Sequence, residues 1–127
     1  MKTHYTVMAL MLAGIAIGAV AIQSLYAQAK PPVYFVAEND VTDPLGYKTE
    51  YIPLAQASIK AHGGRYLAAG TAIPFAGEPP KSRVVIHVWD SIEQLQGWFN
   101  SPDYKDVRKI GEKYAKFRNY AIEGVPQ

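Results

Sequence analysis

Residues 84–91, Val-Val-Ile-His-Val-Trp-Asp-Ser, decide how this chain folds. β-Branched residues and a Trp within a few positions predict a strand over Val84–Trp89. Ser91 follows as a helix N-cap residue, and Gln94 three positions later is the partner in a capping box. The stretch therefore predicts a strand followed at once by a helix.

On the N-terminal side, the sequence predicts one more strand and a long helix. Val33–Glu38 is β-branched and aromatic, as strands are. Asp43 and Pro44 suit the N-cap and first position of a helix, and apolar residues then recur at three- and four-residue steps. Gly63-Gly64 ends this helix, while Pro53 inside it removes a hydrogen bond and should kink it near Thr49.

The remaining elements are also marked by local chemistry. Arg65–Ala69 is predicted to be a strand, and Gly70–Arg83 a long loop because it is rich in Pro and Gly. The helix after Ser91 is broken before Ser101-Pro102, where a further helix starts by the same capping logic. A last strand is expected over Phe117–Glu123.

These elements predict an α+β fold with the order β-α-β-β-α-β, if the two adjacent helices count as one broken element. This is the ferredoxin-like arrangement, an antiparallel sheet with helices on one face only. Val85, His87 and Trp89 share one side of their strand, and we expect them on the face without helices. Such an apolar face marks an interface, so we expect a homodimer packed sheet against sheet, a dimeric α/β barrel.

The first 29 residues are predicted to be a cleaved signal peptide. Val7–Ile22 is apolar and uncharged, but shorter than the roughly 20 residues of a comfortable membrane span. Ala27-Gln28-Ala29 then matches the small-residue motif of a cleavage site. We expect a periplasmic or secreted protein without stable membrane association after cleavage; an uncleaved anchor is the alternative.

Composition excludes several classes of function. Removing Lys2 with the leader leaves a net charge near +1, too weak for an electrostatic nucleic-acid binder. The chain has no Cys, which excludes disulfides, thiolate catalysis and Cys-based metal sites. Only His62 and His87 remain after cleavage, and neither has a neighbour at a metal-ligand spacing, so no metal and no cofactor is expected.

Four motifs carry a resemblance to a known family. They are Val41-Thr42-Asp43-Pro44 with Tyr47 and Tyr51; Ala61-His62-Gly63-Gly64-Arg65-Tyr66-Leu67; Arg83-Val84-Val85-Ile86; and Trp98-Phe99-Asn100-Ser101-Pro102-Asp103-Tyr104. Together they resemble the DUF1330 family over about residues 33–124. The resemblance implies a ferredoxin-like fold of the dimeric α/β barrel superfamily, and it implies no reaction and no catalytic residue.

His87 is the candidate catalytic residue. Its imidazole is centred in an apolar strand, where burial should keep it neutral and able to accept a proton near pH 7. The competing interpretation is a packed histidine in the dimer interface.

His87 and six further residues are candidates for ligand binding. Arg65 and Arg83 lie at strand ends, where two arginines can hold a carboxylate, and His62 lies at a helix C-terminus, where capping is the alternative. The aromatic candidates are Tyr47, Trp98 and Tyr104. One interpretation is that they line a pocket, and the alternative is that they form part of the core.

Three functions stay open at this point. The first is an exported, dimeric domain that binds a small molecule. The second is a cofactor-free enzyme, oxygenase- or isomerase-like, that acts on a small aromatic or lactone substrate. The third is a structural or accessory dimer.

Overall fold

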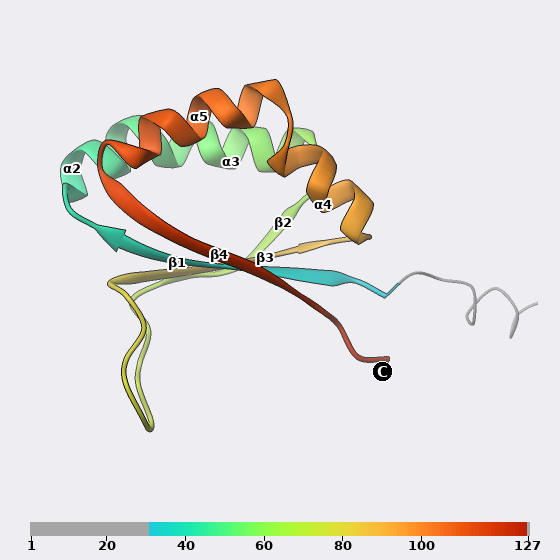
Figure 1. Cartoon of the computed structure of the whole chain (residues 1–127), viewed down its shortest axis with the longest axis horizontal. Helices are drawn as coiled ribbons and strands as arrows, with labels where there is room; N and C mark the ends of the chain where they lie inside the picture. The colour runs from blue at the N-terminus through green and yellow to red at the C-terminus, as the bar shows by residue number, and fades with distance from the viewer. Residues whose placement is uncertain (1–30, 127) are drawn as a thin grey trace, which may run out of the picture. The chain divides into compact units, whose positions relative to one another are not determined.

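The computed structural model of the chain describes residues 31–126, and the predicted signal peptide lies outside this range. In chain order the elements are β1 (Val33–Val41), α2 (Pro44–Gly46), the π-helical turn η1 (Tyr47–Tyr51), α3 (Ile52–Ala61), β2 (Arg65–Gly70), β3 (Arg83–Trp89), α4 (Ile92–Phe99), α5 (Pro102–Glu112) and β4 (Ala115–Glu123). The strands form one four-stranded antiparallel sheet of order β2-β3-β1-β4. All helices lie on one face of it (Figure 1), which confirms the predicted ferredoxin-like α+β fold.

The first helical segment starts and bends where the sequence predicts. The Asp43 side chain accepts a hydrogen bond from the Gly46 amide, and Pro44 follows at the first helical position. The π-helical turn over 47–51 comes directly before Pro53. Because proline has no N–H to donate to the carbonyl of Thr49, the regular α-helical ladder cannot run through this point.

The end of α3 is a Schellman motif. Gly63 has a φ of 94°, the left-handed region that favours glycine. Its amide donates to the Lys60 carbonyl at 3.1 Å, and the Gly64 amide donates to the Ile59 carbonyl at 2.9 Å. The predicted helix stop is confirmed.

The structure corrects the predicted faces of β3. β1 pairs antiparallel with β3, with Val33 opposite Trp89 and Phe35 opposite His87. Val85 and Trp89 belong to the core cluster that packs against the helices and also holds Ile59, Leu95 and Trp98. The prediction that Val85, His87 and Trp89 form the helix-free face is therefore wrong, since these side chains are covered by the helices of their own chain.

The helix-free face, called here the open face, consists of the alternate residues. It carries the apolar side chains of Tyr34, Val36, Val84, Ile86, Tyr120 and Ile122, which are half-buried or exposed. At one end it carries an ion pair between Arg118 and Glu38, with 3.5 Å between nitrogen and oxygen. The expectation of an apolar face without helices is confirmed, but its residues are the opposite set.

Among residues 31–126, the structure contains no helix that combines the length and the hydrophobicity needed to span a bilayer.

Candidate functional site

His87 lies at one end of the space between the sheet and the helices, enclosed by aromatic rings. It is 2% exposed. Its ring stacks on Phe35 with 4.6 Å between centroids and meets the edges of Trp98 at 5.3 Å and Tyr66 at 5.7 Å. The indole nitrogen Nε1 of Trp89 donates a hydrogen bond to Nδ1 of His87 at 2.6 Å.

This environment keeps His87 neutral but removes its use as a base. Burial lowers the pKa of His87 to about 4, because the charged imidazolium is poorly solvated there. Since Nδ1 accepts from Trp89, the proton of the neutral ring is on Nε2. A general base needs a free lone pair, but the lone pair of Nδ1 already accepts the hydrogen bond from Trp89. The other ring nitrogen, Nε2, carries a proton and cannot accept one.

A pocket of about 760 Å³ lies at the other end of the same space, beside the start of β3. We call it the Arg83 pocket. It is lined by Val41, Pro44, Tyr47, Lys48, Ile52, Gly70, Thr71, Ser82 and Arg83. The predicted ligand-binding residues Tyr47 and Arg83 are thus brought together, with 5.8 Å between the guanidinium carbon and the centre of the tyrosine ring.

Arg83 and its neighbour Asn39 have unused hydrogen-bonding capacity. They are direct partners across β1 and β3, and the Asn39 Nδ2 donates to the Tyr47 hydroxyl at 2.8 Å. The buried Arg83 Nε and Asn39 Oδ1 have no hydrogen-bond partner in the part of the chain that the structure describes. Within residues 31–126, Arg83 forms no ion pair with a carboxylate. A half-buried guanidinium without a counter-charge is costly, so this arrangement favours an anion.

The other lining residues strengthen this electrostatic preference. Lys48 adds a second positive charge, and no carboxylate is among the lining residues. Val41, Pro44 and Ile52 supply an apolar wall. The pocket therefore combines a cationic centre with apolar surface, which suits a small organic anion.

His62 is not part of this pocket. The Nε2 of His62 lies 3.1 Å from Oδ1 of Asp103 on α5. The Ser58 hydroxyl donates a hydrogen bond to the other oxygen of the same carboxylate, Oδ2, at 2.9 Å. Hydrogen bonds from Ser101 and Ser58, with a smaller contribution from His62, lower the pKa of Asp103 to about 2. His62 thus connects the end of α3 to α5 and is already partnered.

Arg65 lies far from Arg83, which contradicts the idea that the two hold one carboxylate. Arg65 pairs with Val88 at the end of β3, whereas Arg83 opens that strand. Five residues of β-strand separate the two positions by about 17 Å. The two strands are antiparallel, so their first residues lie at opposite ends of the sheet.

Trp98 and Tyr104 belong to the core rather than to a pocket wall. Their rings lie 4.1 Å apart between centroids, and each is at most 2% exposed. Trp98 Nε1 donates to the Ser58 hydroxyl at 3.2 Å, and the Tyr104 hydroxyl lies 3.1 Å from that of Tyr51. These polar atoms are satisfied inside the fold.

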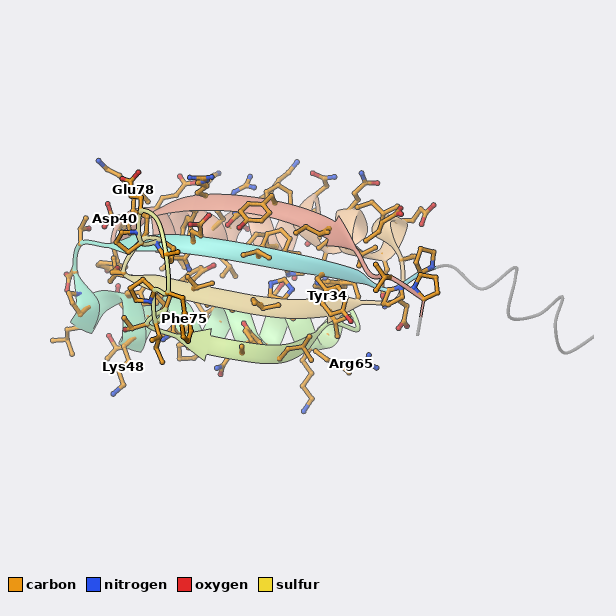
Figure 2. The ribbon with its side chains drawn as sticks, turned by 90° about the horizontal axis from the view of Figure 1, so that it is seen from below. Tyr34, Asp40, Lys48, Arg65, Phe75 and Glu78 are labelled. Carbon is orange, nitrogen blue, oxygen red and sulfur yellow. The ribbon has the colours of Figure 1, made fainter. Side chains whose placement is uncertain are left out.

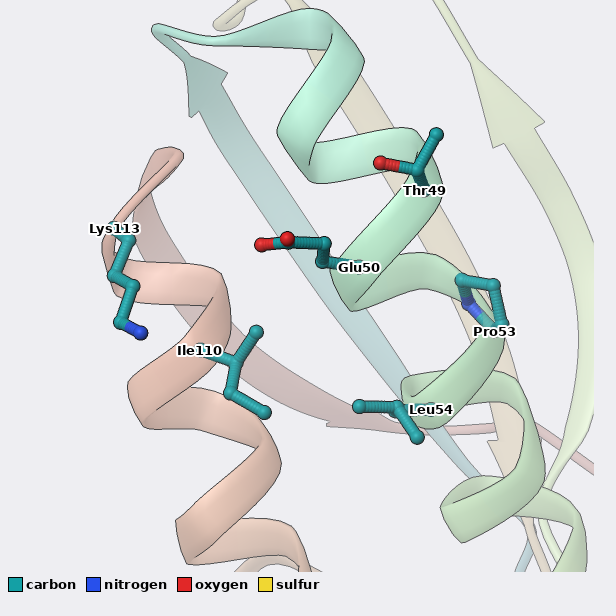
Figure 3. Close-up of a pocket in the computed structure, with 6 residues that line it drawn as sticks. All are labelled: Thr49, Glu50, Pro53, Leu54, Ile110 and Lys113. Atoms are coloured by element: carbon teal, nitrogen blue, oxygen red, sulfur yellow. The ribbon is translucent and has the colours of Figure 1, made fainter.

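A second hollow of about 440 Å³ lies on the outer surface of the helices (Figure 3). It is lined by Thr49, Glu50, Pro53, Leu54, Ile110 and Lys113. Leu54 and Ile110 approach each other across it in Figure 3, and the Glu50 carboxylate already accepts a hydrogen bond from the Tyr114 hydroxyl. It contains no buried unpaired polar group, so the Arg83 pocket is the better candidate.

Sequence reasoning missed the polar lining residues Lys48, Thr71 and Ser82, and also Asn39 beside them. Asn39 lies in phase with Phe35 and Ala37, so the alternation of β1 shows that it shares a face with these two core residues. Among residues 31–126, no three side chains of the His, Cys, Asp and Glu types gather in a way that could hold a metal ion.

The fold belongs to a class shared with several solved structures at low sequence identity. The cofactor-independent oxygenase SnoaB from Streptomyces nogalater is 13% identical, with a TM-score of 0.58 over 76% of this chain and 96% of that one. The protein of unknown function RPA0582 from Rhodopseudomonas palustris is 15% identical, with a TM-score of 0.61 over 82% and 94%. A putative antibiotic biosynthesis monooxygenase from Caulobacter crescentus CB15 is 14% identical, with a TM-score of 0.52 over 77% and 93%. At these identities the likeness concerns the fold alone.

The family itself is shown by sequence. The model of the domain of unknown function DUF1330 matches residues 32–125, so the chain belongs to the DUF1330 family, as its motifs predicted. No curated protein matches the chain in sequence.

Proposed function

We propose that the protein binds a small organic anion in the Arg83 pocket. The observation that carries this proposal is the guanidinium of Arg83, which is half-buried, has no carboxylate partner within residues 31–126 and keeps a buried Nε without a hydrogen bond. Arginine stays charged at any physiological pH, so the guanidinium remains available to pair with an anion.

A carboxylate on a ring or a short hydrocarbon fits the pocket best. The planar fork of arginine matches the two oxygens of a carboxylate. The apolar wall and the Tyr47 ring offer contact to a hydrophobic body. The volume of about 760 Å³ lies in the usual range of small-molecule sites, about 300–1,000 Å³.

Titration with benzoate, with its neutral isostere benzamide as control, tests the proposal. We expect benzoate to shift the backbone amide NMR signals of the pocket residues and benzamide to leave them unchanged. Arg83→Gln should weaken benzoate binding by about 10- to 100-fold, the effect of losing a charge-assisted hydrogen bond. Arg65→Gln is the matched control and should bind as the wild type does. Equal binding of benzoate by the Arg83 and Arg65 variants would contradict the proposal.

The cofactor-free enzyme is the weaker alternative. SnoaB is described as a cofactor-independent oxygenase, but only the fold is shared with it. His87, the predicted base, is enclosed by aromatic rings and uses Nδ1 to accept the Trp89 indole proton. Turnover of a small aromatic or lactone substrate that is lost in His87→Asn, while benzoate binding persists, would favour the enzyme instead.

We further propose that the domain is a homodimer through the open face. Its apolar side chains lie next to one another on three neighbouring strands without a covering helix, which is the pattern of an interface. Sedimentation of the mature chain at about 10 μM should show a dimer, and Ile86→Asp in the centre of the face should give a monomer because the charge would be buried unpaired. Leu45→Asp, which changes an exposed apolar residue outside the sheet, is the control and should stay dimeric. A monomeric wild type would contradict the proposal.

Export is the remaining part of the proposed function. Cleavage after Ala29 is expected from the Ala27-Gln28-Ala29 motif, and it would leave Lys30 as the new N-terminus in a periplasmic or secreted protein. Intact-mass analysis of the exported protein tests this, and a product that retains residues 1–29 would contradict it.

A further inference from the structure

The loop between β2 and β3, residues 71–82, projects from the sheet on the side opposite the helices (Figures 1 and 2). We call it the arm. Its apolar side chains Phe75 and Ile73 are 99% and 81% exposed. Exposed apolar residues on a protruding segment are typical of a contact with another molecule.

The arm is stiff and fixed at its base. Pro74, Pro79 and Pro80 restrict its backbone. The Ser82 hydroxyl donates to the carbonyl of Asn39 at 3.1 Å and accepts from the amide of Val41 at 3.0 Å, which joins the root of the arm to the end of β1. The root of the arm is thus fixed and three prolines restrict its backbone, which lowers the entropic cost of binding through it.

The two halves of the arm differ in chemistry. Toward the sheet, Glu78 and Lys81 line a hollow of about 410 Å³ together with Glu38 and Arg118 of the open face. This part is polar and suited to water. The apolar residues Ile73 and Phe75 lie in the other half of the arm, and no element within residues 31–126 covers them.

The size of the open face indicates that a sheet-to-sheet contact alone would be small. Four strands spaced about 4.8 Å apart, with seven residues at about 3.3 Å each, give a footprint of roughly 450 Å². A stable interface buries about 800 Å² on each partner. The real surface is corrugated, so its area is larger than this flat footprint and closer to that of a stable interface. The arms extend over the same side of the sheet and supply further area.

We propose that the arm of each copy packs against the other copy in the homodimer, with Phe75 and Ile73 as its apolar anchors. This inference rests on the proposed homodimer through the open face. A second copy is the occupant that fits, because the open face alone falls short of the area of a stable dimer and the arm supplies further apolar surface on the same side. In a two-fold arrangement both arms make the same contact, so each apolar anchor residue contributes two contacts per dimer.

Sedimentation equilibrium of the mature chain with Phe75→Ser tests this inference. We expect the dimer dissociation constant to rise by about 100-fold, because two buried aromatic anchors are lost per dimer. Leu45→Ser is the matched control, since Leu45 is 72% exposed but lies on α2, and it should leave the constant unchanged. A dimer whose constant is unchanged by Phe75→Ser overturns the arm contact and leaves the homodimer standing. A monomeric wild type overturns both.

Limited chymotrypsin digestion gives a second readout on the wild-type chain alone. The enzyme cuts after Phe75 when the arm is free. Digestion above and below the dimer dissociation constant should show cleavage at Phe75 that is at least about 10-fold faster in the dilute, monomeric sample, because local protection follows the population of the closed form. Equal cleavage in both samples overturns the arm contact.

Discussion

The two ends of the space between the sheet and the helices differ in how their polar groups are satisfied. At the His87 end, Trp89 and Trp98 use their indole N–H groups for internal hydrogen bonds, and the rings pack on one another. At the Arg83 end there is a hollow of about 760 Å³, and the Arg83 Nε has no partner. One end is therefore fully packed, and the other leaves hydrogen-bonding capacity unused.

The same two strands build both ends. β1 contributes Phe35 at the His87 end and Asn39 at the Arg83 end, each directly opposite the central residue of that end on β3. A histidine can lose its charge when buried, whereas an arginine cannot. The fold therefore accepts His87 without a counter-charge but leaves Arg83 in need of one, and the predictions below test this difference.

The largest effect is expected for Trp89→Ala at the His87 end. Trp89 is 0% exposed, so the change should lower the free energy of unfolding by about 3–5 kcal/mol. It also removes the N–H that His87 accepts. Urea denaturation of the mature chain measures the loss.

Ile122→Ala is the control for this change. Ile122 is 56% exposed on the open face, so under dilute, monomeric conditions its loss should cost less than about 1 kcal/mol. If Trp89→Ala dissociated a dimer without lowering the stability of the monomer, Trp89 would belong to an interface, and the assignment of the two faces would be wrong.

The second prediction concerns pH and His87. Burial lowers the pKa of His87 to about 4 in the folded chain, whereas an unfolded histidine titrates near 6.5. Between these values the unfolded chain binds more protons, so stability should fall as pH drops from about 6.5 to 4, by up to about 3 kcal/mol in total. Above pH 6.5 this contribution is constant.

Urea denaturation at several pH values, on the wild type and on His87→Asn, isolates this contribution. Asn can still accept a hydrogen bond but does not titrate in this range. The difference in unfolding free energy between the two proteins should shrink or invert as pH falls from 6.5 to 4.5. A difference that does not change with pH would mean that His87 is solvated in the folded state.

Local chemistry in the sequence was sufficient for the elements and their order. Asp43 and Ser91 cap helices as expected, Gly63 has the left-handed conformation, and the irregular turn comes just before Pro53. These features depend on a few neighbouring residues. For this reason sequence reasoning can place them without knowledge of the tertiary packing.

The faces of β3 could not be predicted in the same way. Both sides of the strand are apolar, with Val84 and Ile86 on one and Val85 and Trp89 on the other. Alternation shows which residues share a face but not which face the helices cover. The outcome depends on long-range packing, since Trp89 stacks on Trp98 of α4 with 5.2 Å between centroids.

The separation of Arg65 and Arg83, in contrast, was within reach. Each arginine opens its strand, and the two strands follow each other in an antiparallel sheet. Their first residues must then lie at opposite ends. The topology that the sequence predicted correctly was enough to rule out a shared carboxylate.

The smallest effect on stability is expected for Arg83→Met at the Arg83 end. The change keeps apolar bulk against Tyr47 and removes a buried Nε that has no partner. It also removes a contact between the guanidinium and the Tyr47 ring, which is worth about 0.5–1 kcal/mol at such sites. Because the two effects oppose each other, the free energy of unfolding without ligand should stay within about 1 kcal/mol of the wild-type value.

Urea denaturation in a buffer without organic anions, repeated with 50 mM benzoate, separates a binding group from a structural one. Benzoate should stabilise the wild type by an amount that grows with its concentration relative to Kd, as for any ligand that binds only the folded state. It should leave Arg83→Met unchanged. The Arg65→Met variant should respond to benzoate as the wild type does, because Arg65 lies at the far end of the sheet.

A loss above about 2 kcal/mol for Arg83→Met without ligand would show that Arg83 is held by partners inside the fold. In that case the contrast between the two ends would disappear, since both would then serve stability.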